Sequence, residues 1–301
     1  MLIRKVIRYV CIATMLLGSI SVYAEEVSLP YKGLTLNGNL LLAPGKQLNE
    51  GVVLVTHGAL AHYGMETIVN LQGLLKEAGY SSIAINLSLG LDNRRGMYDC
   101  KQTHRHRHDD AVEEIDAWIA WLKSQGARKV TLLGHSRGGG QTALYAAERD
   151  NDLVNAVVLM APQTDENGGA GYRQRYNQPL APILENAQAL VKQGKGKTVL
   201  THANILFCRD VSATAESFVS YYGRDPRLDT PSLIPRIKKP TLVVVAGEDE
   251  VVRGLDKKIA PLVRGNRVHM KVISGSDHFF RDLYADDAVD AIDVFLTSVN
   301  R

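Results

Sequence analysis

A serine in a strongly constrained setting is the first residue of this chain that could do chemistry. Ser136 lies in Gly134-His135-Ser136-Arg137-Gly138, directly after a strand-like run at 129–133. The flanking glycines indicate a tight strand-to-helix turn, which exposes the hydroxyl beside the first amides of the helix. A serine hydroxyl becomes a nucleophile only when a base accepts its proton and an acid orients that base. The pentapeptide therefore directs attention to histidines and carboxylates elsewhere in the chain.

A candidate base and a candidate acid each follow a strand-like run. His278 comes after the run at 268–273, and Asp249 comes after the run at 241–246. Because the carboxyl ends of parallel strands meet at one edge of a sheet, we expect these side chains to converge with Ser136. The alternative acids are Glu248, Glu250 and Asp165.

The elements that must position these residues alternate along the chain. Continuous apolar runs, typical of strands covered on both faces, occur at 52–56, 82–86, 130–133, 154–160, 241–246 and 268–273. Apolar spacings of three and four predict helices around 68–75, 112–122, 143–147 and 288–295. Alternation at 29–42 predicts an antiparallel hairpin that turns at Asn37-Gly38. The fold class is therefore α/β, a mostly parallel, doubly wound sheet opened by an antiparallel hairpin.

One stretch, at about 163–212, departs from this alternation. It contains Gly168-Gly169-Ala170-Gly171 and scattered tyrosines. We interpret it as a small cap inserted over the strand ends, with a long surface loop without function as the alternative. A cap in this place would control which substrates enter.

Three motifs together resemble the α/β-hydrolase fold superfamily of serine hydrolases. They are Thr56-His57-Gly58-Ala59, the pentapeptide around Ser136, and Ser276-Asp277-His278-Phe279. The resemblance covers nearly all of the chain after residue 24. It implies an α/β-hydrolase fold with Ser136 as nucleophile, His278 as general base and acid, and Asp249 as the orienting carboxylate. By the same resemblance, the backbone amides of Ala59 and Arg137 form the oxyanion hole, and His57 and His135 are structural.

The function that the resemblance implies is an esterase- or lipase-like serine hydrolase, which cleaves a carboxylic ester through an acyl-enzyme. A thioesterase or a peptidase would use the same residues, and a non-catalytic binding or assembly protein on this fold is a further alternative. The expected partners are a small-molecule acyl substrate and water. No cofactor is expected.

The segment from His104 to His108 raises the question of a metal site. Arginines alternate with its three histidines and oppose a cation, so we expect no metal there. We interpret the segment as a loop at the substrate edge or as an ordinary solvated segment. A metal-dependent hydrolase that uses these histidines is the alternative.

The first 24 residues are predicted to be a secretory signal peptide. Three basic residues precede an apolar run at 10–20, and small residues end at Ala24 with cleavage-site spacing. Because the run is about half of the roughly 20 residues that a spanning helix needs, no membrane span is expected after cleavage. We expect an exported protein, periplasmic or secreted, with one hydrolase domain at 25–301.

Composition and cysteine content limit the alternatives further. Three of the 35 Lys and Arg lie in the predicted signal peptide and none of the 32 Asp and Glu does, which leaves 32 of each. This balance gives no support for a nucleic-acid face. Export would leave Cys100 and Cys208, which an oxidising compartment favours as a disulfide. Two buried free thiols are the alternative, and the sequence contains no signal for an oligomeric state.

Overall fold

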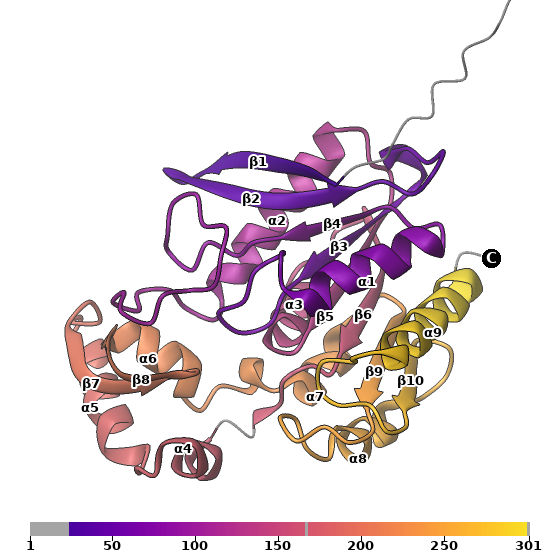
Figure 1. Cartoon of the computed structure of the whole chain (residues 1–301). Helices are drawn as coiled ribbons and strands as arrows, with labels where there is room; N and C mark the ends of the chain where they lie inside the picture. The colour runs from indigo at the N-terminus through magenta and orange to yellow at the C-terminus, as the bar shows by residue number, and fades with distance from the viewer. Residues whose placement is uncertain (1–23, 166–167, 300–301) are drawn as a thin grey trace, which may run out of the picture.

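One sheet of eight strands organises the protein. A computed structural model describes residues 24–165 and 168–299 (Figure 1), so the predicted signal peptide lies outside the described residues except for Ala24. The strand order is β1-β2-β4-β3-β5-β6-β9-β10. Neighbours from β4 to β10 pair in parallel, whereas β1 and β2 pair antiparallel with each other and β2 with β4. The bounds are β1 Glu25–Tyr31, β2 Leu34–Leu41, β3 Val52–Thr56, β4 Ser82–Ile85, β5 Val130–His135, β6 Val154–Met160, β9 Thr241–Ala246 and β10 Val268–Ile273. The predicted mostly parallel α/β sheet is therefore confirmed.

The opening hairpin turns at a different dipeptide from the one predicted. β1 and β2 meet at Lys32 and Gly33, whose φ angles of 47° and 80° suit a two-residue turn. The prediction of a turn at Asn37-Gly38 is wrong, because both residues lie inside β2. Asn37 is buried there, and its amide donates to the carbonyl of Arg94 over 3.2 Å. A tertiary hydrogen bond thus accompanies Asn37 in a strand, although asparagine followed by glycine favours turns.

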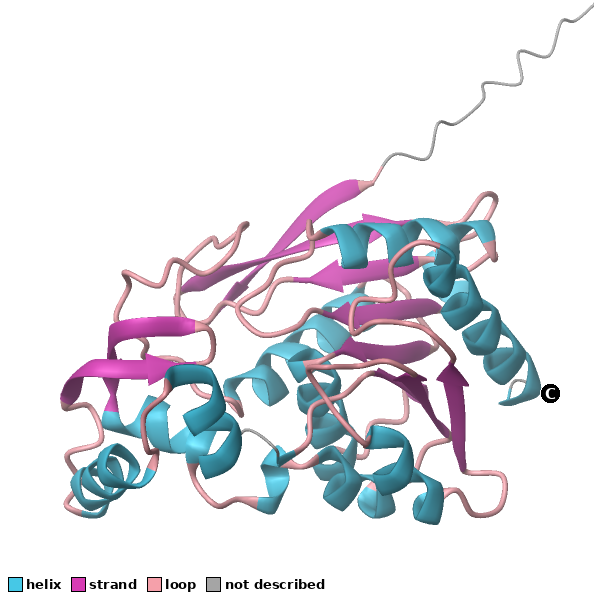
Figure 2. Ribbon diagram, turned by 60° about the horizontal axis from the view of Figure 1, so that its bottom comes forward, coloured by secondary structure: helices cyan, strands magenta, loops and turns pink. Residues whose placement is uncertain are grey.

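Helices cover both faces of the sheet (Figures 1 and 2). α1 (Glu66–Glu77) and α9 (Leu283–Val299) share one apolar core, and α2 (Asp110–Ser124) and α3 (Arg137–Glu148) share the other. Successive residues of β3 alternate between these cores, which explains why its run is apolar at every position. Within the described ranges, no helix combines the length and apolar character needed to cross a membrane.

A separate group of elements follows β6 and precedes β9 in the sequence, and it lies at one side of the sheet (Figure 1). It contains α4 (Gly169–Tyr176), α5 (Ala181–Lys192), an antiparallel pair of β7 (Val199–Ile205) and β8 (Cys208–Thr214), and α6 (Ala215–Tyr222). The short helices η3 (Pro226–Leu228), α7 (Thr230–Leu233) and η4 (Ile234–Arg236) lead back to β9. We call residues 168–236 the insertion; its elements continue beyond residue 212. The remaining short helices are η1 (Leu48–Glu50), α8 (Leu255–Ile259) and η5 (Ala260–Leu262).

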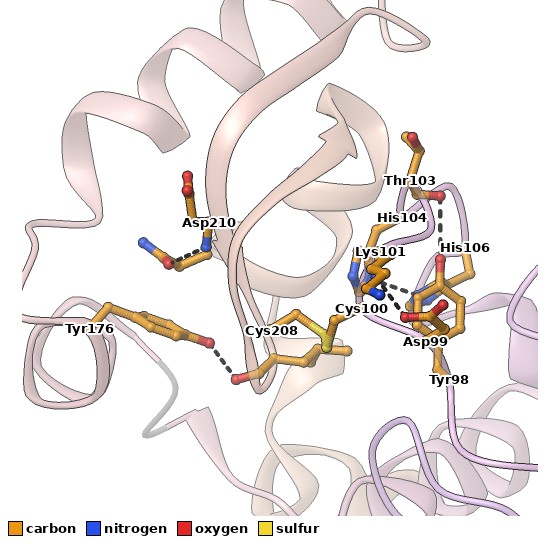
Figure 3. Close-up of a disulfide and its surroundings, with 12 residues drawn as sticks. Tyr98, Asp99, Cys100, Lys101, Thr103, His104, His106, Tyr176, Cys208 and Asp210 are labelled. Carbon is orange, nitrogen blue, oxygen red and sulfur yellow. Dashed lines mark hydrogen bonds between the residues drawn. A yellow bond between two sulfur atoms is a disulfide. The ribbon is translucent and has the colours of Figure 1, made fainter.

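A disulfide connects the insertion to the loop before α2. Cys100 and Cys208 are bonded, with a Cα–Cα distance of 5.4 Å and a separation of 108 residues in sequence (Figure 3). A β-bridge between His104 and Ala213 lies on the same two segments. The loop at 99–109 is therefore attached to β8 by a covalent bond and by backbone hydrogen bonds.

Candidate active site

Ser136 occupies a strained turn between β5 and α3. Its φ and ψ are 57° and −124°, a conformation that costs a non-glycine residue energy and occurs mainly at functional sites. A Cβ atom at Gly134 would overlap the carbonyl of Gly138, and one at Gly138 would overlap the carbonyl of His57. The two glycines of the pentapeptide are thus required by close backbone packing, which holds the serine in this turn.

His278 lies between Ser136 and Asp249. Its Nε2 is 2.8 Å from Ser136 Oγ, and its Nδ1 is 2.7 Å from Asp249 Oδ2. The side chains of His278 and Asp249 are only 5% and 3% exposed, so water competes little with these bonds. Asp249 Oδ1 also accepts from the amides of Val251 and Val252, at 2.7 and 2.8 Å. Burial acts to raise the pKa of Asp249, but the bonds from His278 and these two amides outweigh it and lower that pKa.

The alternative acids lie apart from this arrangement. Glu248 and Glu250 are exposed on either side of Asp249. Asp165 Oδ1 is 3.2 Å from Lys258 Nζ. The structure brings Asp249, and neither neighbour nor Asp165, to the imidazole.

The two amides expected to form an oxyanion hole lie beside the serine. Ala59 and Arg137 line a cavity of about 370 Å³ together with Ser136. Neither amide donates to an acceptor within the described part of the chain. The amide of Arg137 is free because it belongs to the first residue of α3. Both residues thus border the same cavity as Ser136, and their amides have no acceptor among the described residues.

A hydrogen-bond network around His57 fixes the loop that carries Ala59, and the part of Arg94 in it was not predicted from the sequence. His57 Nδ1 is 2.8 Å from the carbonyl oxygen of Gly58, and its Nε2 accepts from the amide of Leu87 at 3.1 Å and from Arg94 at 3.0 Å. Burial, with the nearby Arg94 charge, lowers the pKa of His57 to about 3, so the ring is neutral and can accept at Nε2. Arg94 also donates to the carbonyls of Leu87, Ala61 and Gly96, at 2.8, 2.7 and 2.6 Å.

His135 holds the backbone of the candidate base. Its Nε2 is 2.8 Å from the carbonyl oxygen of His278. Burial, together with the nearby His278, lowers the pKa of His135 to about 4, so the neutral ring donates Nε2–H to that carbonyl. His135 therefore contacts His278 through its main chain and leaves the imidazole free to face Ser136.

The histidines at 104, 106 and 108 are buried, so the interpretation of this segment as solvated is wrong for them. His104 Nδ1 is 3.1 Å from His106 Nε2, and His106 Nδ1 is 2.7 Å from the hydroxyl of Tyr221. Burial lowers the pKa values of the three to about 4, 3 and 3. No cluster able to hold a metal ion is present among the described residues. The alternation of buried histidines with arginines at 105 and 107 instead reflects an extended segment with one inner face.

Comparison with known proteins assigns the family. A family model described as the alpha/beta hydrolase fold matches residues 51–280, which include every residue of the site. The chain belongs to the α/β hydrolase fold family. It is 23% identical over 212 residues to phospholipase YtpA of Bacillus subtilis (strain 168), a match that covers 67% of this chain and 76% of that protein.

Solved structures of the same fold cover almost the whole hydrolase. Est1E from Butyrivibrio proteoclasticus superposes with a TM-score of 0.63 at 17% identity, covering 91% of this chain and 98% of Est1E. A monoacylglycerol lipase from Paleococcus ferrophilus gives a TM-score of 0.60 at 20% identity and covers 88% and 99%. These similarities support the fold.

Proposed function

We propose that this α/β hydrolase is an exported serine hydrolase that cleaves a carboxylic ester through an acyl-enzyme. The observation that carries the proposal is the pair of short contacts from His278, to Ser136 Oγ at 2.8 Å and to Asp249 Oδ2 at 2.7 Å. These contacts give the serine a base in hydrogen-bond reach and give the base an acid that selects its tautomer.

Acylation begins when Ser136 Oγ attacks the ester carbonyl and His278 Nε2 accepts the hydroxyl proton. Nδ1–H of His278 donates to Asp249, which stabilises the imidazolium as it forms. The oxygen of the tetrahedral intermediate accepts from the amides of Ala59 and Arg137. Each such donor is worth roughly 3 kcal/mol of transition-state stabilisation in enzymes where one has been removed.

Collapse of that intermediate breaks the bond to the alcohol, which leaves with the proton from His278. A water molecule then attacks the acyl-enzyme, His278 accepts its proton, and the acid is released with Ser136 regenerated. Water is the second substrate, and no step requires a cofactor.

The insertion acts as the cap in this proposal. Gly171, Gln174 and Arg175 from α4, with Leu206 and Phe207 between β7 and β8, line the cavity that contains Ser136. The acyl or alcohol part of the ester would therefore contact the insertion, while the sheet edge supplies the chemistry. Similar proteins include a phospholipase, an esterase and a lipase, which makes an ester the first choice of substrate.

Export is the second part of the proposal. The basic and apolar pattern of residues 1–24 supports it, as does the bond between Cys100 and Cys208, since disulfides persist in oxidising compartments. Amino-terminal sequencing of the protein recovered from a periplasmic fraction is expected to begin at Glu25.

Labelling with a fluorophosphonate tests the nucleophile. Folded wild-type protein should react, and Ser136→Ala, whose fold is verified by circular dichroism, should not. A panel of p-nitrophenyl esters of increasing acyl length, a thioester and an aminoacyl amide then identifies the bond cleaved. Absence of labelling in folded wild-type protein would rule out the serine mechanism and favour a binding protein on this fold. Equal labelling of Ser136→Ala would assign the reactive nucleophile to another residue.

A further inference from the structure

The side chain of Arg137 is a buried cation with few partners. Arg137 is 7% exposed, its Nη1 is 3.5 Å from His108 Nδ1, and its guanidinium carbon lies 5.2 Å from the ring centre of Tyr221. Its Nε is fully buried without a hydrogen-bond acceptor in the described part of the chain. No carboxylate within residues 24–165 and 168–299 forms an ion pair with it.

Burying a charged guanidinium costs free energy unless hydrogen-bond acceptors satisfy its N–H groups. A guanidinium has five N–H donors, and here one long contact to a neutral imidazole and one aromatic face are present. Arg94 shows what a completed buried arginine looks like in the same protein, since three carbonyls and His57 accept from it. Arg137 therefore has unused capacity to bind an acceptor.

That capacity lies next to the candidate nucleophile. Arg137, Gln163 and Thr164 line both the 370 Å³ cavity that contains Ser136 and a second cavity of about 620 Å³. These shared residues make the two cavities neighbours. Gln163 also has a buried Oε1 without a donor among the described residues. Two incomplete polar groups thus mark the boundary between the reacting centre and the larger cavity.

The carboxylates that also line the larger cavity already form ion pairs or hydrogen bonds within the protein. Asp165 is 3.2 Å from Lys258, and Asp225 accepts from the amide of Arg227 at 2.9 Å. Asp229 accepts from the hydroxyl of Ser232 at 2.6 Å, at the start of α7. Arg137 differs from these three carboxylates because its Nε has no hydrogen-bond partner among the described residues.

We propose that Arg137 binds an oxyanion carried by the ester substrate, a carboxylate or a phosphate, while the ester carbonyl lies at Ser136. This inference rests on the proposed esterase function and adds the substrate class. The planar guanidinium matches either oxyanion with two parallel N–H bonds, and burial strengthens such bonds. The preferred substrates are then negatively charged esters, and uncharged esters of the same length react more slowly.

Two matched pairs of esters separate the two sources of the charge. p-Nitrophenyl hydrogen glutarate and p-nitrophenyl pentanoate differ by a carboxylate on the acyl side. Hexanoylglycerol phosphate and hexanoylglycerol differ by a phosphate on the alcohol side. In one of these pairs, the wild-type protein should favour the charged member by about 10- to 100-fold in kcat/KM, the range expected for a charge-assisted hydrogen bond. The pair that shows the preference identifies the source.

Variants assign the preference to Arg137. Arg137→Met should reduce the charged-to-neutral ratio to near one, and Arg137→Lys, which keeps the charge without the fork, should retain part of it. The ratio is the readout because the amide of Arg137 also belongs to the oxyanion hole. Arg253→Gln removes an exposed cation that lines the same cavity as Ser136, and it should change the ratio by less than about threefold.

Binding provides a readout that does not depend on hydrolysis. In Ser136→Ala, monomethyl glutarate or glycerol phosphate should raise the melting temperature, dimethyl glutarate and glycerol should not, and Arg137→Met should abolish the effect. Equal kcat/KM values within both ester pairs, or a preference that survives in Arg137→Met, overturns the proposal even if the serine is labelled. If no ester is hydrolysed and no label is taken up, the esterase function fails, and the melting-temperature result alone decides the role of Arg137.

Discussion

Two buried arginine–histidine pairs near Ser136 differ in how completely they are hydrogen bonded. Arg94 and His57 are 3.0 Å apart, and the remaining polar atoms of both side chains bond to backbone groups of the loops at 57–61 and 86–96. Arg137 and His108 are 3.5 Å apart, and Arg137 Nε and His108 Nε2 have no partner within the described residues. Burial is similar in the two pairs, so it does not distinguish them.

The difference separates a structural pair from a pair available for binding. Removing Arg94 would take a donor from the buried carbonyls of Leu87 and Ala61. Removing Arg137 would take away one long contact to His108 Nδ1. An arginine whose removal costs little and whose position borders the cavity with Ser136 is better explained by what it binds than by what it stabilises. Four predictions test this distinction, and the first concerns the residues that contact His278.

The largest effect is expected for Asp249→Asn. His278 and Asp249 form a third buried and fully bonded pair, but one that faces a nucleophile. An amide at position 249 would favour the wrong imidazole tautomer, so kcat should fall on the order of 10³- to 10⁴-fold. Steady-state kinetics on the best p-nitrophenyl ester measures this, and Glu250→Gln is the matched control. Comparable activity of Asp249→Asn and the control would contradict the assignment of the acid.

The next largest effect is on stability. Arg94→Met should lower the free energy of unfolding by about 3 kcal/mol, because the carbonyls of Leu87, Ala61 and Gly96 lose a buried donor. Urea denaturation measures the change. Arg95→Gln is the control, because Arg95 is exposed and pairs with exposed Glu26, a contact worth less than about 1 kcal/mol. Equal losses in the two variants would show that the Arg94 network is not structural.

A smaller effect should be common to both pairs and appear with pH. Burial lowers the pKa values of His57 and His108 to about 3, below the 6.5 of an exposed imidazole. Between these values the unfolded chain takes up protons that the folded chain does not, so stability is complete above pH 6.5 and falls as pH decreases. At pH 5.5 each histidine should cost about 1 kcal/mol relative to pH 7.5.

The histidine effect is measured by urea denaturation at the two pH values. His57→Gln and His108→Gln should each lose about 1 kcal/mol less than wild type on going from pH 7.5 to 5.5. A reduced dependence in only one of the two variants would mean that burial differs between the pairs after all.

The smallest effect is expected for Arg137→Met. Replacing an incompletely paired buried cation with an apolar side chain of similar length should change the free energy of unfolding by less than about 1 kcal/mol. The loss of the contact with Tyr221 opposes the gain from removing a buried charge. A loss as large as that of Arg94→Met would place Arg137 among the structural residues and weaken the case for a bound oxyanion.

The sequence predicted the strands and helices that carry the site because those signals are local. Continuous apolar runs located β3, β5, β6, β9 and β10, and glycine spacing located the turn at Ser136. The predicted position of the hairpin turn is wrong because Asn37-Gly38, a typical turn dipeptide, lies in a strand where Asn37 contacts Arg94. No local pattern marks Asn37 as a core residue.

The residues around the reacting groups were harder to anticipate. Arg94 and Arg137 are both arginines in polar, glycine-containing stretches, and only the folded chain shows that one meets three carbonyls and the other meets an aromatic ring. The histidines at 104–108 suggested solvent or a substrate-edge loop because arginines separate them. Their burial depends on Tyr221 and β8, which come more than a hundred residues later in the chain.

The Cys100–Cys208 bond has a practical consequence for anyone producing this protein. It connects β8 of the insertion to the loop that contributes His108, and Leu206 and Phe207 of the Ser136 cavity directly precede Cys208. Material made in a reducing cytoplasm would lack that link and would present a looser wall to the substrate. Preparations from different expression hosts should therefore differ in substrate selectivity before they differ in the ability of the serine to be acylated.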